Sequence, residues 1–134
     1  MLERWCVTLT IDGLLTLARA QLERVAPEDL GDEQQRGALV VDIRPEDQRR
    51  RDGPLPGAVV IDRNVLEWRL APSSLHRVPE STEGRRVILV CNEGFSSSLA
   101  AATLHMVGVT GATDLIGGFQ AWATIRAQVE SNKS

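Results

Sequence analysis

The stretch RVILVCNEGFSS, residues 86–97, joins a short apolar run to a polar loop that contains a glycine. An uninterrupted apolar run of this length is typical of a strand that is buried on both faces of a parallel sheet. The alanine-rich residues after the loop predict a helix over about 97–107 that ends at Gly108. Cys91 therefore lies where a strand gives way to a helix.

Similar apolar runs recur along the chain, with helical patterns between them. They predict further strands over 38–43, 58–61 and 113–116. We expect helices over about 13–24, capped by Asp12, over about 65–70 and over about 119–130, with a polar connector at 26–37 and a polar tail at 131–134. This alternation predicts an α/β fold, an open and mainly parallel sheet of about five strands with helices on both faces. The site of such a fold lies at the carboxyl ends of its strands.

Length and composition limit the class of protein. A chain of 134 residues can close one hydrophobic core, so a single domain over 1–134 is expected. The formal net charge of −3 gives no general attraction for nucleic acid or anionic lipid. No apolar run approaches the roughly 20 residues that span a bilayer as a helix. We expect a soluble, cytoplasmic protein with neither nucleic acid nor membrane as a partner.

Cys6 and Cys91 are the two cysteines of the chain. Two cysteines exclude a disulfide framework, and no Cys/His cluster has the spacing of metal ligands. We expect no metal and no organic cofactor. A bridge between the two sulfurs would require a short Cα separation, and we expect none.

The loop after Cys91 is suited to binding an anion. Gly94 permits an unusual backbone angle, so successive amide N–H groups and the helix N-terminus can point at the sulfur. Such donors favour a thiolate and would equally hold a persulfide anion. The alternative is that Cys91 is a buried core residue, because free cysteine is among the most buried residue types. The spacing alone leaves both interpretations open.

Three blocks of sequence resemble one known family. The segment VDIR at 41–44, followed by GPLPGA at 53–58, is similar to the pattern D-[VI]-R and then G-H-I-P-G-A, with Pro54 where histidine is usual. The loop CNEGFSS at 91–97 is similar to C-x-x-G-x-R-S, and residues 114–122 are similar to a segment that ends L-x-G-G-x-x-A-W. Over about residues 8–126 the chain thus resembles the rhodanese family of sulfurtransferases.

The resemblance implies a persulfide relay on Cys91. The thiolate would take sulfane sulfur from a donor such as thiosulfate and pass it to cyanide or another thiol. The remaining loop residues would form the persulfide-binding site, with Phe95 as a wall of the pocket: Asn92, Glu93, Gly94, Phe95, Ser96 and Ser97. Asp42 and Arg44 are expected to support the site, Arg44 through an ion pair with Asp42 or Glu93, although an arginine after a buried strand is commonly structural.

The loop also departs from the family pattern. Ser96 stands where the family has an arginine, so the side chain expected to clamp a dianionic donor is missing. Glu93 adds a negative charge that repels anionic donors. We therefore expect thiosulfate to be a poor donor and protein or low-molecular-weight persulfides to be better ones. Ser96 and Ser97 could donate to a persulfide, but simple helix capping is the favoured interpretation.

Two other functions compete with sulfur transfer. A non-catalytic module that binds a protein partner or senses oxidants would fit Ser96 and Glu93. A phosphatase or arsenate reductase with a C-x5-R loop would need an arginine to hold its oxyanion, and the loop has none.

Other residues have weaker functional signals. Arg49–Arg51 is interpreted as a solvated surface turn. His105 is expected to pack at the edge of the core or on the surface. His76 is expected in a loop at 72–79 that could fold over the site, although nothing in its local sequence demands chemistry. Trp68 and Trp122 are assigned to the core.

Overall fold

The computed structural model describes residues 8–133, and its centre is a sheet of four parallel strands. The spatial order is β2-β1-β3-β4, with bounds β1 Leu39–Asp42, β2 Val59–Val60, β3 Val87–Val90 and β4 Ala112–Asp114. The predicted α/β fold is confirmed, with four strands among the described residues instead of about five. Beyond β4 the sheet continues only as a single parallel bridge between Val25 and Leu115.

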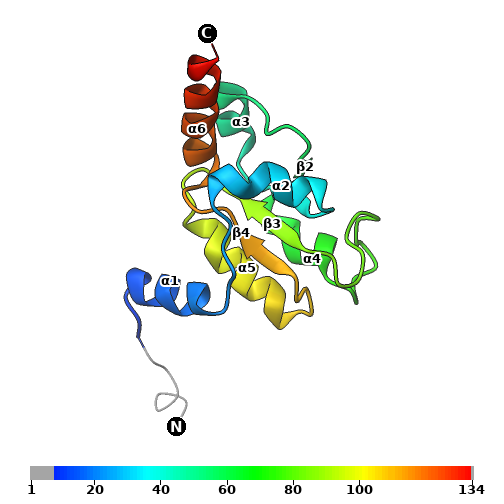
Figure 1. The fold of residues 1–134 in the computed structure, drawn as a ribbon. Coiled ribbons are helices and arrows are strands. Elements are labelled where there is room, and N and C mark those ends of the chain that lie inside the picture. The colour runs from blue at the N-terminus through cyan, green and yellow to red at the C-terminus, as the bar shows by residue number, and fades with distance from the viewer. Residues whose placement is uncertain (1–7, 134) are drawn as a thin grey trace.

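Helices follow and flank the strands (Figure 1). The longer ones are α1 (Ile11–Ala20), α5 (Ser96–Met106) and α6 (Gly118–Asn132). The shorter ones are η2 (Pro27–Asp29), α2 (Leu30–Gln35), α3 (Glu46–Asp52), η3 (Arg63–Val65) and α4 (Leu66–Leu70). No helix among residues 8–133 is both long enough and apolar enough to cross a bilayer.

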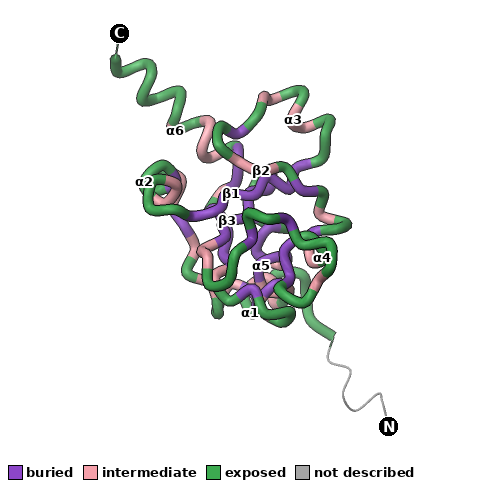
Figure 2. The backbone as a smooth tube through the Cα atoms, turned by 90° about the vertical axis from the view of Figure 1, so that its right-hand side faces the viewer, coloured by how far each residue is buried: buried purple, intermediate pink, exposed green. Residues whose placement is uncertain are grey.

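Alternate residues of β1 and β3 enter two separate cores, because successive side chains of a strand point to opposite faces. Val41 and Leu89 join one core, which also contains side chains of α4 and α5. Val40 and Ile88 join the other, with Leu30, Leu115 and Phe119 from the α2 and α6 side. Both faces of the sheet are therefore covered, which explains why the central strands are continuously apolar. Figure 2 shows these buried strands and the mostly buried α5 in the interior, with the exposed segments around them.

Several local predictions were wrong. The connector at 26–37 contains η2 and α2, because Leu30 is buried against the sheet and anchors a short helix. Arg49–Arg51 lies within helix α3, where the first-turn acids and last-turn arginines suit the helix dipole. The tail is helical as far as Asn132. The cap of α1 is Thr10, whose hydroxyl accepts the Gly13 N–H at 2.9 Å, and not Asp12.

Parallel pairing places the carboxyl ends of the strands side by side. Asp42 pairs with Val90, and Leu89 pairs with Asp114. The residue after β3 is Cys91, so the cysteine emerges between two strands that each end in a buried aspartate. The sheet register alone brings these three residues to one edge.

Candidate active site

Cys91 is 6% exposed and follows β3 directly. The N–H of Gly94 donates a hydrogen bond to its sulfur at 3.1 Å. The thiol in turn lies 3.2 Å from the hydroxyl oxygen of Ser97 and donates to it. The 91–97 loop thus curls back on the sulfur, with one amide N–H on the sulfur among the described residues where the sequence suggested several.

Behind the sulfur lies a buried carboxylate. Asp114 is fully buried at the end of β4, and its Oδ2 accepts the hydroxyls of Ser97 and Ser98, each at 2.7 Å. Arg24 binds the same carboxylate with two nitrogens, Nε to Oδ1 at 2.8 Å and Nη2 to Oδ2 at 3.2 Å. The Ser97 hydroxyl donates its one hydrogen bond to Asp114. A lone pair of its oxygen is therefore left to accept from the Cys91 thiol.

Carbonyl groups of the loop are bound from its outer side. The first turn of α6 donates to two of them, Phe119 N–H to Cys91 O at 2.9 Å and Gln120 N–H to Asn92 O at 3.1 Å. Two arginines bind the third, since Arg19 Nη2 and Arg24 Nη2 donate to Gly94 O at 2.8 and 3.2 Å. Arg19 Nε also donates to Ser98 Oγ at 3.0 Å.

A pair of glycines at the start of α6 lets the loop approach so closely. A Cβ on Gly118 would lie 2.5 Å from the carbonyl oxygen of Cys91. A Cβ on Gly94, whose φ is +87°, would lie 2.8 Å from the nitrogen of Gly117. The contact between the backbone of the 91–97 loop and the start of α6 therefore requires glycine on both sides, at Gly94 and at Gly118.

Asp42 and Arg44 lie beside the site and contact it through Phe119. They form a buried ion pair of 2.8 Å, and Arg44 also donates to Gly53 O at 2.9 Å. The guanidinium stacks 3.7 Å from the ring centroid of Phe119, whose N–H binds the Cys91 carbonyl. Of the two partners expected for Arg44, Asp42 is the one observed. The buried Nη1 of Arg44 has no hydrogen-bond acceptor among the described residues, because the guanidinium stacks on the ring of Phe119.

The other predicted loop residues lie at the rim. Glu93, Phe95 and Ser96 are exposed, and Phe95 has Arg19 5.9 Å from its ring centroid. Phe95 occupies the cap position of α5 without a side-chain hydrogen bond, so the capping interpretation of Ser96 and Ser97 was wrong. Ser97 instead binds Asp114, because a buried carboxylate competes better for its hydroxyl than solvated helix amides do.

A series of hydrogen bonds between side chains links the loop to α3. Asn92 Oδ1 accepts from Gln120 Nε2 at 3.0 Å, and Gln120 Nε2 also donates to Asp52 at 2.9 Å. A hydrogen bond from Arg51 lowers the pKa of Asp52 below the ordinary carboxyl value, so the exposed end of this series is a carboxylate at neutral pH.

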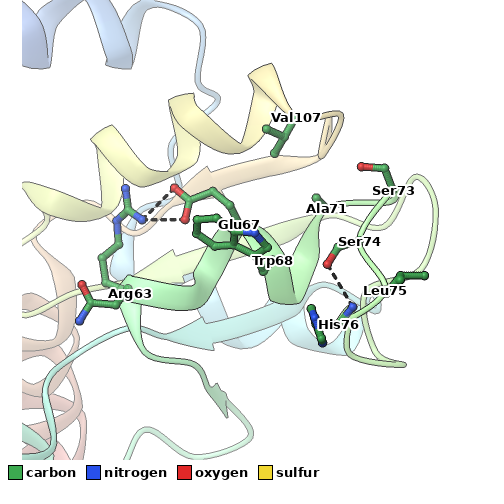
Figure 3. Close-up of a pocket in the computed structure, with 10 residues that line it drawn as sticks. Arg63, Glu67, Trp68, Ala71, Ser73, Ser74, Leu75, His76 and Val107 are labelled. Atoms are coloured by element: carbon green, nitrogen blue, oxygen red, sulfur yellow. Dashed lines mark hydrogen bonds and ion pairs between the residues drawn. The ribbon is translucent and has the colours of Figure 1, made fainter.

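The weaker candidates lie elsewhere. His105 sits at the far end of α5, where Nε2 lies 2.6 Å from the carbonyl oxygen of Ala112, a packing position at the edge of the core. His76 and Trp68 line a surface pocket of about 990 Å³ together with the Arg63–Glu67 ion pair (Figure 3). None of the lining residues of this pocket belongs to the 91–97 loop.

The two tryptophans differ in their surroundings. Trp68 is 58% exposed, so its assignment to the core was wrong. Trp122 is partly buried and lies 5.4 Å from Phe119 between ring centroids, which confirms its packing role. Cys6 lies outside the described residues. Within residues 8–133 no group of three or more His, Cys, Asp or Glu side chains is arranged to hold a metal ion.

Sequence inspection missed four residues of this site: Arg19, Arg24, Ser98 and Asp114. Asp114 had a detectable signal, since an acidic residue within a predicted core strand is unusual. The arginines had none, because their partners are 70 or more positions away in the sequence.

The sequence model of the rhodanese-like domain family matches residues 26–125. The chain belongs to this family. A thiosulfate sulfurtransferase, GlpE of Pseudomonas aeruginosa, is 31% identical over 103 residues, which cover 77% of this chain and 86% of that protein. GlpE of Pseudomonas fluorescens is 30% identical over 117 residues, covering 86% and 98% of the two chains. Relatives of this rhodanese-like domain thus include named sulfurtransferases.

Solved structures agree on the fold. A Rhodopseudomonas palustris protein of unknown function, described as a "possible tyrosine phosphatase", superposes with a TM-score of 0.80 at 29% identity and covers 90% of this chain and 94% of its own. The human single-domain sulfurtransferase TSTD1 superposes with a TM-score of 0.63 at 23% identity, covering 75% and 95%. The second likeness concerns the fold alone.

Proposed function

We propose that this rhodanese-like domain is a sulfurtransferase that carries sulfane sulfur as a persulfide on Cys91. The observation that carries the proposal is the 3.1 Å hydrogen bond from Gly94 N–H to the sulfur, inside a loop whose carbonyls are bound from outside. Amide donors directed at a sulfur stabilise its anion without any cofactor. Sulfurtransferase relatives support the same reaction class.

The reaction has two balanced steps. With thiosulfate, the Cys91 thiolate attacks the sulfane sulfur, a new S–S bond forms, and sulfite leaves with the electron pair of the broken bond. The persulfide anion is then attacked at its terminal sulfur by cyanide, which gives thiocyanate and restores the thiolate. A thiolate acceptor gives a persulfide in the same way. Each step is a nucleophilic displacement, so no net oxidant or reductant is consumed.

The rim of the loop points to the class of donor. Ser96 is exposed at the start of α5, so a short hydroxyl occupies the position from which the family's arginine would reach a donor. Glu93 is exposed next to it and disfavours dianions. Because Cys91 is 6% exposed, only a slender sulfane group can reach it. We propose low-molecular-weight or protein-bound persulfides as donors in preference to thiosulfate, and a thiol as acceptor.

Mass spectrometry tests the proposal directly. Reduced protein is incubated with glutathione persulfide or with thiosulfate, and the peptide that contains Cys91 is compared with that of Cys91→Ser. A gain of about 32 Da on Cys91, discharged by cyanide or a thiol, is expected. No adduct with either donor would overturn the proposal and favour a non-catalytic binding module, which the burial of Cys91 would also fit.

The structural likeness to a "possible tyrosine phosphatase" raises one further candidate. A C-x5-R loop would place its arginine at residue 97, and Ser97 here is buried against Asp114. A carboxylate at that place repels the phosphoryl oxyanion that an arginine would bind. We expect no hydrolysis of p-nitrophenyl phosphate.

A further inference from the structure

We infer that Arg19 and Arg24 are positioning residues for the Cys91 loop, acting from outside it. The inference rests on the proposed function and deepens it. The two arginines would fix the backbone of the loop around an anionic sulfur, and kcat would depend on this positioning. Neither arginine touches the sulfur in the structure.

The first step is the geometry of the peptide unit. In a trans peptide the C=O and the following N–H point in opposite directions, and the described chain has no cis peptide bond. Binding the Cys91 and Asn92 carbonyls to α6 therefore turns the next two N–H groups away from α6. The arginines bind Gly94 O in the same way, which turns the Phe95 N–H away from them. The two arginines do for the third carbonyl what α6 does for the first two. Together these contacts fix the peptides on both sides of the Glu93–Gly94 peptide, whose N–H is the one that donates to the sulfur.

The second step is that the arginine contacts form a closed ring. Arg19 joins Gly94 O to Ser98, Ser98 joins Arg19 to Asp114, and Arg24 joins Asp114 back to Gly94 O. Every link is 2.7–3.2 Å long. A ring that includes a buried carboxylate and a two-nitrogen arginine contact is rigid, so the Gly94–Phe95 peptide has little freedom to flip.

The third step is the balance of charge. Asp114 is paired with Arg24, whereas Arg19 makes no ion pair among residues 8–133. The ring thus carries one excess positive charge on the outer side of the loop that holds the sulfur. A positive charge beside the loop stabilises an anionic persulfide held there. Because it lies behind the loop, it cannot grip a donor as a loop arginine would.

The origin of the arginines supports the same view. Both precede residue 26, where the family match begins. Arg19 lies on α1, which packs against α5. Arg24 directly precedes Val25, and the bridge between Val25 and Leu115 holds Arg24 beside Asp114. Both arginines therefore reach the loop from residues that precede the matched range.

The test compares Arg19→Gln and Arg24→Gln with a matched control, Arg126→Gln. Arg126 is 61% exposed on α6 and is not bound to the loop, so the control removes the same charge elsewhere. The full chain is used throughout. Folding is checked by thermal unfolding, and the alkylation rate of Cys91 by iodoacetamide is followed by peptide mass spectrometry across a range of pH. Sulfur transfer from glutathione persulfide gives kcat and KM.

We expect Arg19→Gln and Arg24→Gln to slow Cys91 alkylation at neutral pH by about threefold to tenfold, the net value of one ordinary hydrogen bond, with Arg126→Gln unchanged. The difference should shrink toward alkaline pH, where every thiol is ionised, because the ring acts on the anion and not on access to it. The loss of transfer should fall on kcat, with KM for the donor unchanged.

A folded Arg19→Gln protein with wild-type alkylation and kcat would overturn the inference, even if Arg24→Gln fails to fold. Slowing by the same factor at every pH would overturn it too, since that indicates altered access. The proposed function fails separately. If the wild type transfers no sulfur while alkylation still depends on Arg19, the positioning role stands without the reaction.

Discussion

Replacing Gly94 with alanine tests whether the close approach of the loop to α6 holds the site together. Gly94 has a φ of +87°, and its new Cβ would lie 2.8 Å from Gly117 N and 3.2 Å from both Gly117 Cα and Gly118 N. All three atoms are backbone, so no flexible side chain can move aside. The matched control is Gly37→Ala, because Gly37 has a similar φ of +98° and open space around its Cβ position.

The two substitutions share one cost and differ in another. A positive φ costs alanine about 1–2 kcal/mol at either position. At Gly94 the loop and the start of α6 must also separate by several tenths of an ångström, and overpacking of this kind costs about 1–3 kcal/mol. We expect Gly37→Ala to lower the free energy of unfolding by about 1–2 kcal/mol and Gly94→Ala by about 2–5 kcal/mol.

Urea unfolding of both variants and the wild type measures this difference, and the alkylation rate of Cys91 reports on the loop. Gly94→Ala should slow alkylation, because moving Gly94 lengthens the 3.1 Å contact of its N–H with the sulfur. Gly37→Ala should leave alkylation unchanged. Equal stability of the two variants, within about 0.5 kcal/mol, would refute the reasoning that backbone contact with Gly117 sets the loop position.

Three further predictions concern the surroundings of the site. Asp114→Ala should lower the free energy of unfolding by about 3–5 kcal/mol in urea, because the partly buried Arg24 would lose its ion-pair partner and the buried hydroxyls of Ser97 and Ser98 would lose their acceptor; a loss below about 1 kcal/mol would contradict this. Trp68→Ala should cost less than about 1 kcal/mol, since the ring is 58% exposed, and a loss typical of core aromatics would show hidden packing. The pKa of Asp52 is lowered by Arg51, so its stabilising effect is present above the usual carboxyl range and is lost as pH falls through the lowered value. Asp52→Asn should therefore melt below the wild type at neutral pH and converge with it in acid, and a gap that persists in acid would exclude ionisation as the cause.

Local sequence patterns predicted the central elements well where one force dominates. The runs at 38–43 and 86–90 became β1 and β3 because their apolar side chains are buried on both faces. The alanine-rich helix after the loop became α5 within a residue of the predicted bounds. The 26–37 segment misled because its polar composition hides one buried anchor, Leu30, which decides that α2 packs on the sheet. Trp68 misled because α4 turns that position outward.

The sequence by itself determined the α/β fold, the position of Cys91 between a strand and a helix, and the glycines that the loop needs. These features depend on residues close together in the chain, whose apolar spacing and backbone freedom are legible locally. Only the tertiary structure decided what surrounds the sulfur. Asp114, Arg19 and Arg24 reach the loop because strand register and helix packing bring them to loop residues that are 17–75 positions away in the sequence. The spacing of charged side chains in the sequence does not indicate which distant residue each one will bind. The hydrogen bonds of these three residues were therefore visible only in the tertiary structure.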